Sequence, residues 1–208
     1  MGADKGTLTY TTYFVLDEPE AGFREKFMES VRRHAFRDID IEAGKDRSVG
    51  WVLLGDPFSS ELEWGAVFQD PYVCLSLRED VIRIPRTVFL AHFEHRMKEF
   101  LHDEGRDSLR KGEKSALKED VLHQLRRRAL ADIKTYDVVW NTVDRTLRLW
   151  THSARVRESF EEIVRETWGV RLVPQAPYTL VMARSENNEA AVALLEVEPA
   201  ILVEGVEA

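Results

Sequence analysis

Lysine and arginine side chains gather in one stretch of an otherwise acidic chain. Residues 105–134 hold nine bases against five acids, whereas the whole sequence carries a formal net charge of −8. Ammonium and guanidinium groups neutralise phosphate oxygens, so this stretch predicts contact with a polyanion. The ordinary alternative is a solvated helix whose charges pair along its surface or stabilise its end. The bases are Arg106, Arg110, Lys111, Lys114, Lys118, Arg126, Arg127, Arg128 and Lys134, and the acids are Asp107, Glu113, Glu119, Asp120 and Asp132.

Two further groups of polar side chains could in principle hold a metal ion. His92, His95 and Glu99 share the polar face of one predicted helix, but their spacing matches no established metal motif. The acidic run at residues 38–42 has the alternating carboxylates that phosphodiester hydrolysis uses to hold metals, but no second acidic cluster accompanies it. We therefore predict no catalytic residue, no metal site and no cofactor.

The hydrophobic pattern predicts the elements that position the basic stretch. Pro85 precedes a predicted helix, and Gly112 or Ser108 is expected to cap the next one. The residues after Pro177 fit either strands or a short helix at 179–182 and 190–197. Strands are expected at 8–16, 49–54, 64–68, 72–77, 136–140, 146–150 and 170–173, and helices at 21–36, 86–102, about 112–129 and 153–168.

This order of elements predicts an α+β fold with two small strand/helix lobes flanking a projecting basic two-helix arm. The expected divisions are an N-terminal lobe at 1–84, the arm at 85–134, a second lobe at 135–178 and an acidic C-terminal segment at 179–208. Lysines on one sector of the second arm helix give way to leucines further along it. That change predicts a helix whose base packs and whose tip projects into solvent.

Composition indicates the cellular compartment in which the protein works. Cys74 is the only cysteine, so no internal disulfide is possible and a reducing compartment is expected. No apolar run approaches the roughly 20 residues that a membrane span needs, and the first residues show no signal segment. We therefore expect a cytoplasmic protein with no membrane partner.

The charge of the last residues differs from that of the rest. Residues 185–208 contain six acids and no Lys or Arg, so the remaining chain is close to neutral. Such a segment either competes with a polyanion for the basic surface or aids solubility.

The basic stretch also carries a family resemblance. Lys111-Gly112-Glu113-Lys114, then Leu117-Lys118-Glu119-Asp120-Val121-Leu122 and Arg128-Ala129-Leu130, resemble the recombination-associated protein RdgC family. Further motifs follow in the family's order, and together they cover roughly residues 10–177. They are Gly50-Trp51-Val52, Arg83-Ile84-Pro85, Trp140-Asn141, Ser153-Ala154 and Val173-Pro174.

The resemblance implies a function that composition alone does not show. It implies a nucleoid-associated homodimer that binds double-stranded DNA without sequence specificity, encircles it as a clamp and restrains RecA-driven recombination. This chain resembles a short form, since typical members continue further at the C-terminus. Leu130 stands where the family has an apolar residue that helps to join subunits. The residues expected to contact DNA are Arg110, Lys111, Lys114, Lys118, Arg126, Arg127 and Arg128.

Two alternatives of a different class remain open at this point. The chain could lack DNA binding and act as a dimerisation or protein-interaction module through its arm. A metal-dependent exonuclease is the more distant alternative, because that activity has been suggested for the family.

Overall fold

The computed structural model describes residues 2–3, 9–16, 23–184 and 193 of the 208-residue chain. The elements follow the chain in the order β1 Thr11–Val15, α1 Phe23–Arg33, β2 Arg47–Leu53, α2 Trp64–Val67, β3 Phe68–Gln69, β4 Tyr72–Val81, α3 Arg86–Asp103, α4 Lys111–Arg128, β5 Asp132–Asn141, β6 Thr146–Leu149, α5 Ala154–Trp168, β7 Leu172–Pro174 and α6 Pro177–Arg184.

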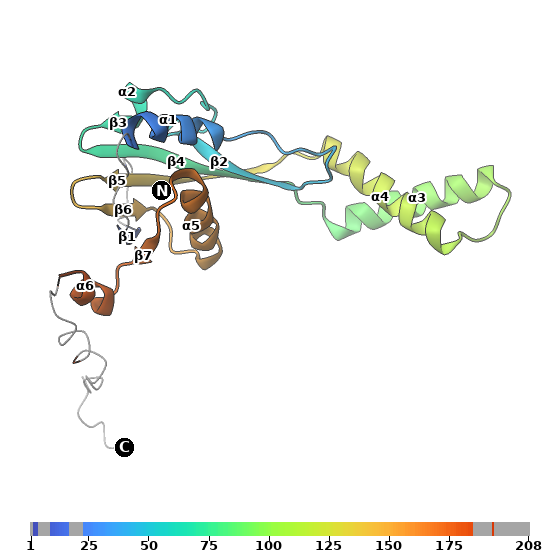
Figure 1. The fold of residues 1–208 in the computed structure, drawn as a ribbon. Coiled ribbons are helices and arrows are strands. Elements are labelled where there is room, and N and C mark those ends of the chain that lie inside the picture. Colours follow the sequence, from blue (N-terminus) through green and yellow to red (C-terminus); the bar gives the residue numbers. More distant parts are fainter. Residues whose placement is uncertain (1, 4–8, 17–22, 185–192, 194–208) are drawn as a thin grey trace, which may run out of the picture.

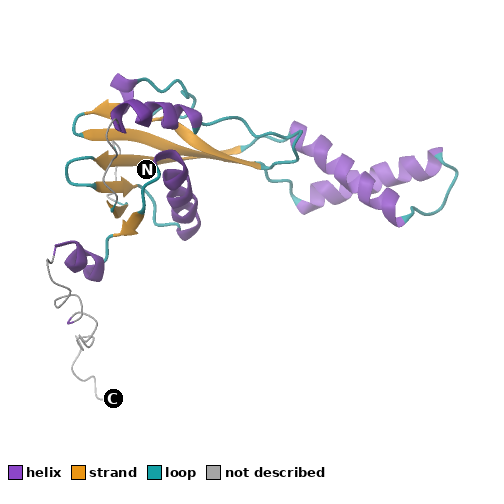
Figure 2. Ribbon diagram, in the orientation of Figure 1, coloured by secondary structure: helices purple, strands orange, loops and turns teal. Residues whose placement is uncertain are grey.

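The strands of the described residues form one antiparallel sheet, in the order β2-β4-β5-β6-β1-β7 with β3 paired to β4. The predicted α+β class is therefore confirmed (Figure 2). The prediction of two separate lobes is wrong, because β4 and β5 pair along their full length, from Tyr72 with Asn141 to Val81 with Asp132. The segments on either side of the arm thus share one sheet and one core.

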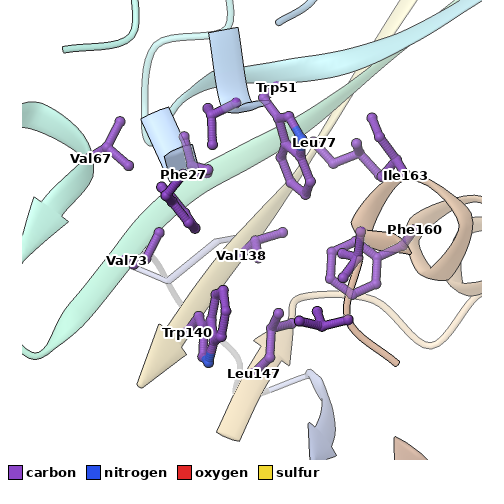
Figure 3. Packing of buried hydrophobic residues seen from close by; sticks show 14 of the residues in the cluster. Phe27, Trp51, Val67, Val73, Leu77, Val138, Trp140, Leu147, Phe160 and Ile163 are labelled. Atoms are coloured by element: carbon purple, nitrogen blue, oxygen red, sulfur yellow. The ribbon is translucent and has the colours of Figure 1, made fainter. Parts of the chain in front are cut away.

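The core lies where α1 and α5 pack against each other and against one face of the sheet (Figure 3). Trp51, Trp140 and Phe27 are almost completely buried there. The Trp168 ring stacks on Phe27 and on Trp51, with ring centroids 5.0 Å apart in both pairs. Each large apolar side chain buried in this way stabilises the fold by about 1.5–3 kcal/mol, so this aromatic cluster anchors both helices.

Gly50 lets the connector between α1 and β2 (residues 34–46) pack closely on β2. A Cβ atom added at Gly50 would collide with the Cα of Phe36 and lie 2.6 Å from its backbone nitrogen. The same connector is fixed by backbone hydrogen bonds from Phe36 N to Trp51 O and from Trp51 N to His34 O, at 2.9 and 3.0 Å. A side chain at position 50 would therefore displace the connector.

Charged side chains are buried at the end of the sheet from which the arm extends. Glu79 on β4 is 3% exposed and accepts hydrogen bonds from Arg155 at 2.8 Å and from Arg47 at 2.6 Å. Burial pushes the pKa of Glu79 up, but the hydrogen bonds from Arg155 and Arg47 outweigh it and the pKa lies below its ordinary value. This carboxylate thus ties β2, β4 and α5 together.

The arm consists of α3 and α4, which run antiparallel to each other and project away from the sheet (Figure 1). Each helix has 18 residues and is therefore about 27 Å long. Among the described residues of the two helices only Phe93 and Val121 are buried, whereas Phe89, Met97 and Phe100 of the predicted apolar stripe are half-buried. The expectation that the tip of α4 projects into solvent is confirmed.

Two local expectations are corrected, and one open alternative is decided in favour of a helix. Residues 64–67 form the short helix α2 instead of a strand, and only Phe68–Gln69 pairs with β4. Arg110, not Gly112 or Ser108, precedes the first residue of α4. Residues 179–182 lie in the helix α6, while residues 190–197 fall almost entirely outside the described residues. None of the described helices is long and apolar enough to cross a membrane.

Candidate nucleic-acid interface on the helical arm

The predicted basic residues lie at the two ends of α4. Arg110 ends the tip loop (residues 104–110), and Lys111, Lys114 and Lys118 lie in the half of α4 next to that loop. Residues 126–128 form the last turn of α4, at the end of the arm nearer the sheet (Figure 1). Arg126 lies 15 positions after Lys111, which corresponds to about 22 Å along the helix axis. The structure therefore divides the predicted set into a tip group and a base group.

The tip loop is closed onto the first turn of α4 by Glu113. The backbone N–H of Arg110 donates to Glu113 Oε2 at 2.9 Å, and Arg106 Nη2 donates to Oε1 at 3.0 Å. The Arg110 N–H and then the Arg106 guanidinium hold the pKa of Glu113 below its ordinary value. A carboxylate at this position also interacts favourably with the helix dipole. Arg106 is therefore engaged within the arm, although its sequence neighbourhood resembles that of the free bases.

The tip carries no excess of bases over acids. Residues 103–120 contain the five bases Arg106, Arg110, Lys111, Lys114 and Lys118 and the six acids Asp103, Glu104, Asp107, Glu113, Glu119 and Asp120. Residues 121–134 contain four bases, with Asp132 as the one acid. Arg83 and Arg86 add two exposed bases at the start of α3. The excess positive charge therefore lies at the base of the arm.

The connector before β2 reaches this basic end. Glu42 Oε2 lies 3.2 Å from His123 Nε2, and Glu42 Oε1 lies 3.9 Å from Arg127 Nε. Arg126 is half-buried and Arg128 is exposed. The three arginines also occupy the helix end at which cations are stabilised by the dipole, so their presence alone does not require a ligand.

Leu130 is the most exposed large apolar side chain among the described residues. It is 95% exposed and follows the end of α4, and Ile133 at the start of β5 is 40% exposed. Single exposed apolar side chains are common on protein surfaces, so this exposure leaves Leu130 available for a contact without requiring one. The predicted role of Leu130 in dimerisation remains a prediction.

The two candidate metal groups are engaged in other contacts. Glu99 pairs with His95 at 3.2 Å and with Arg96 at 3.0 Å. Asp40 accepts a hydrogen bond from the Ala43 backbone N–H, while Glu42 turns to the arm. Within the described part of the chain, no group of three or more His, Cys, Asp or Glu side chains could hold a metal ion.

A cleft of about 460 Å³ lies between the end of α1, the connector, β2 and α5. Its charged lining is mixed, and Arg47 is already bound to Glu79. The cleft therefore lacks the excess of bases over acids that is found at the base of the arm. The bases are Arg33, Arg37, Lys45 and Arg47, and the acids are Asp38, Asp40 and Glu166.

The fold and the charge distribution define an α+β protein with a basic projecting helical arm, suited to contact with a polyanion. A family model described as "Putative exonuclease, RdgC" matches residues 11–189. The chain therefore belongs to the RdgC family, which supports a recombination-associated role in general terms. A comparison with curated proteins gave no match.

Proposed function

We propose that the protein binds duplex DNA through its helical arm, without sequence preference and as a homodimer, and that it restrains a RecA-type recombinase. Family membership supports the association with recombination. The contact with DNA, the homodimer and the effect on the recombinase go beyond what membership establishes.

The proposal rests on the basic side chains of the arm that form no ion pair within the described part of the protein. None of five basic side chains on α4 forms an ion pair with a carboxylate of the described residues. Unpaired cations on a projecting element can approach phosphates without first breaking internal contacts, so binding would cost little rearrangement. The five residues are Lys111, Lys114, Lys118, Arg126 and Arg128.

Sequence preference is not expected from this surface. Base edges in the major groove are distinguished by bidentate side chains on an element seated in the groove. The arm instead places its cations at two separated ends of α4, which suits contacts with the DNA backbone. The interface is therefore proposed to recognise phosphate positions.

The first test is anisotropy of a labelled duplex of roughly 30 base pairs, titrated with protein at roughly 50 and 200 mM salt. Each neutralised phosphate contributes about −0.9 to the slope of log affinity against log salt concentration. Several such contacts should therefore lower the affinity by orders of magnitude over that range. Two duplexes of unrelated sequence should bind equally. Absence of binding at the lower salt concentration would contradict the proposal.

The second candidate function is a protein-interaction module, which the 95% exposure of Leu130 favours. An apolar contact through Leu130 would persist at high salt, whereas a phosphate contact would not. Incubation of labelled DNA with the protein and Mg²⁺ or Mn²⁺ tests the exonuclease alternative directly.

A further inference from the structure

A groove with a volume of about 260 Å³ runs between the middle of α3 and the second half of α4, where it reaches the last turn of α4 at the base of the arm. Val121 and Leu125 from α4 form its apolar floor. Its polar rim comes from His92, His95, Arg96 and Glu99 on α3 and from Gln124 and Arg128 on α4. The groove thus brings one end of the predicted basic group into a concave site.

Much of the polar rim is already paired. Glu99 is bound by Arg96 Nη1 at 3.0 Å and by His95 Nε2 at 3.2 Å. The amide of Gln124 donates to Asp120 Oδ2 at 2.9 Å, and Arg96 Nη2 lies 3.9 Å from the same atom. Glu99, the one carboxylate among the described residues that line the groove, is therefore neutralised within the arm.

His92 and Arg128 are left without a polar partner among the described residues. Both residues line the groove, His92 from α3 and Arg128 from α4, and both side chains carry N–H donors. A guanidinium presents a fork of N–H groups that matches the oxygens of a phosphate, and an imidazole N–H can add a further hydrogen bond. A cation would be repelled by Arg128, and a wholly apolar occupant would desolvate the charged rim.

We propose that this groove binds a phosphate group through Arg128 and His92 and thereby fixes one phosphate of the DNA backbone at the base of the arm. That the bound phosphate belongs to DNA rests on the proposed function. That the groove binds an anion does not. His92 becomes a binding residue that charge patterning alone did not select.

The direct test uses inorganic phosphate and does not depend on DNA. Side-chain ¹H–¹⁵N spectra of the histidines would be recorded at constant pH while phosphate is exchanged for chloride at equal ionic strength. The His92 ring signals should move to saturation, and those of His102 should not, because His102 lies on the same helix outside the groove. The Arg128→Gln variant should abolish the His92 response.

The second test measures duplex affinity for His92→Gln and for His102→Gln as the matched control. The loss of one hydrogen bond to a phosphate in a partly exposed groove should weaken binding about three- to tenfold. The control should bind as the wild-type protein does. Circular dichroism would show that both variants keep the helical content of the arm.

The outcomes separate this inference from the proposed function. If phosphate moves the His92 signals but no duplex binds, the anion site stands and the DNA-binding function fails. If the duplex binds with the expected salt dependence while neither phosphate nor His92→Gln has an effect, the groove inference fails alone. If the His92 signals instead move with protein concentration in the absence of phosphate, a second copy covers the groove and the inference is overturned.

Discussion

Glu42 Oε2 lies 3.2 Å from His123 Nε2, and this contact joins the connector before β2 to α4 across 81 residues of sequence. The other oxygen of the same carboxylate faces Arg127 at 3.9 Å. An acidic side chain thus reaches the end of the arm where the positive charge is in excess. A phosphate approaching Arg127 would compete with it.

Glu42→Gln should therefore raise duplex affinity about two- to fivefold at low salt, because a unit charge near 4 Å in water contributes about 1 kcal/mol. The pair is exposed, so the free energy of unfolding should change by less than about 0.5 kcal/mol. Anisotropy and urea denaturation measure the two quantities. Glu29→Gln removes an equally exposed carboxylate, paired with Arg33 at 2.9 Å and away from the arm, and should change neither. A decrease in affinity for Glu42→Gln would contradict the competition.

Charge removal at the two ends of α4 should have unequal effects. Replacing Arg126, Arg127 and Arg128 together by Gln should weaken duplex binding at least tenfold more than the same change at Lys111, Lys114 and Lys118. The reason is that the tip cations stand among six acids, whereas the base cations do not. The salt slope should become shallower by about 0.9 for each phosphate that the variant no longer neutralises. Equal decreases in affinity for the two triple variants would show that the local excess of charge does not govern binding.

Leu130→Ser should weaken self-association without unfolding the protein. The side chain is 95% exposed, so its removal leaves no cavity and the free energy of unfolding should stay within about 0.5 kcal/mol. Sedimentation velocity over a range of concentrations measures the association. Val143→Ser is the matched control, since Val143 is 73% exposed at the turn between β5 and β6. An unchanged sedimentation coefficient for Leu130→Ser, at concentrations where the wild-type protein associates, would remove Leu130 from the interface.

Local patterns predicted most of the elements but not how they meet. The helices of the arm could be predicted because Pro85 and an apolar spacing define α3, and the hairpin of β5 and β6 because its strands are adjacent in sequence. The pairing of β4 with β5 could not, since the arm separates the two strands and strand patterns do not name a partner. The sequence therefore suggested two lobes where the chain builds one sheet.

Local sequence patterns also do not show which side chains meet at the candidate site. The charge pattern selects the basic residues of α4 and the family resemblance adds the expectation that they contact DNA, but neither shows which of them are engaged in internal contacts. Arg106 is bound to Glu113 seven residues away, a contact that i,i+4 patterning does not predict. Glu42 and His92 approach the basic end of the arm from other elements, so only the folded chain brings them there.

Glu79→Gln should destabilise the protein more than any other change considered for the sheet. Glu79 is 3% exposed and accepts three hydrogen bonds from two arginines, whereas a glutamine would point its N–H groups at one of them. Removing one partner from a fully buried ion pair costs about 3–5 kcal/mol, and the partial exposure of Arg47 and Arg155 lowers the expected loss to about 2–4 kcal/mol. Urea denaturation at pH 7 measures it, and a loss below about 0.5 kcal/mol would contradict the assigned role.

The pH dependence of that loss follows from the lowered pKa of Glu79. A carboxyl whose folded pKa is depressed contributes its full stability above the unfolded value, which is about 4.3 for glutamate, and loses it as the pH falls through the folded value. The difference in unfolding free energy between the wild-type protein and Glu79→Gln should therefore be constant above about pH 5 and shrink on further acidification. The difference for Glu29→Gln, whose carboxylate is solvated, should stay within about 0.5 kcal/mol throughout. A Glu79→Gln difference that grew towards low pH would mean that the protonated carboxyl, not the carboxylate, is the form that the two arginines stabilise.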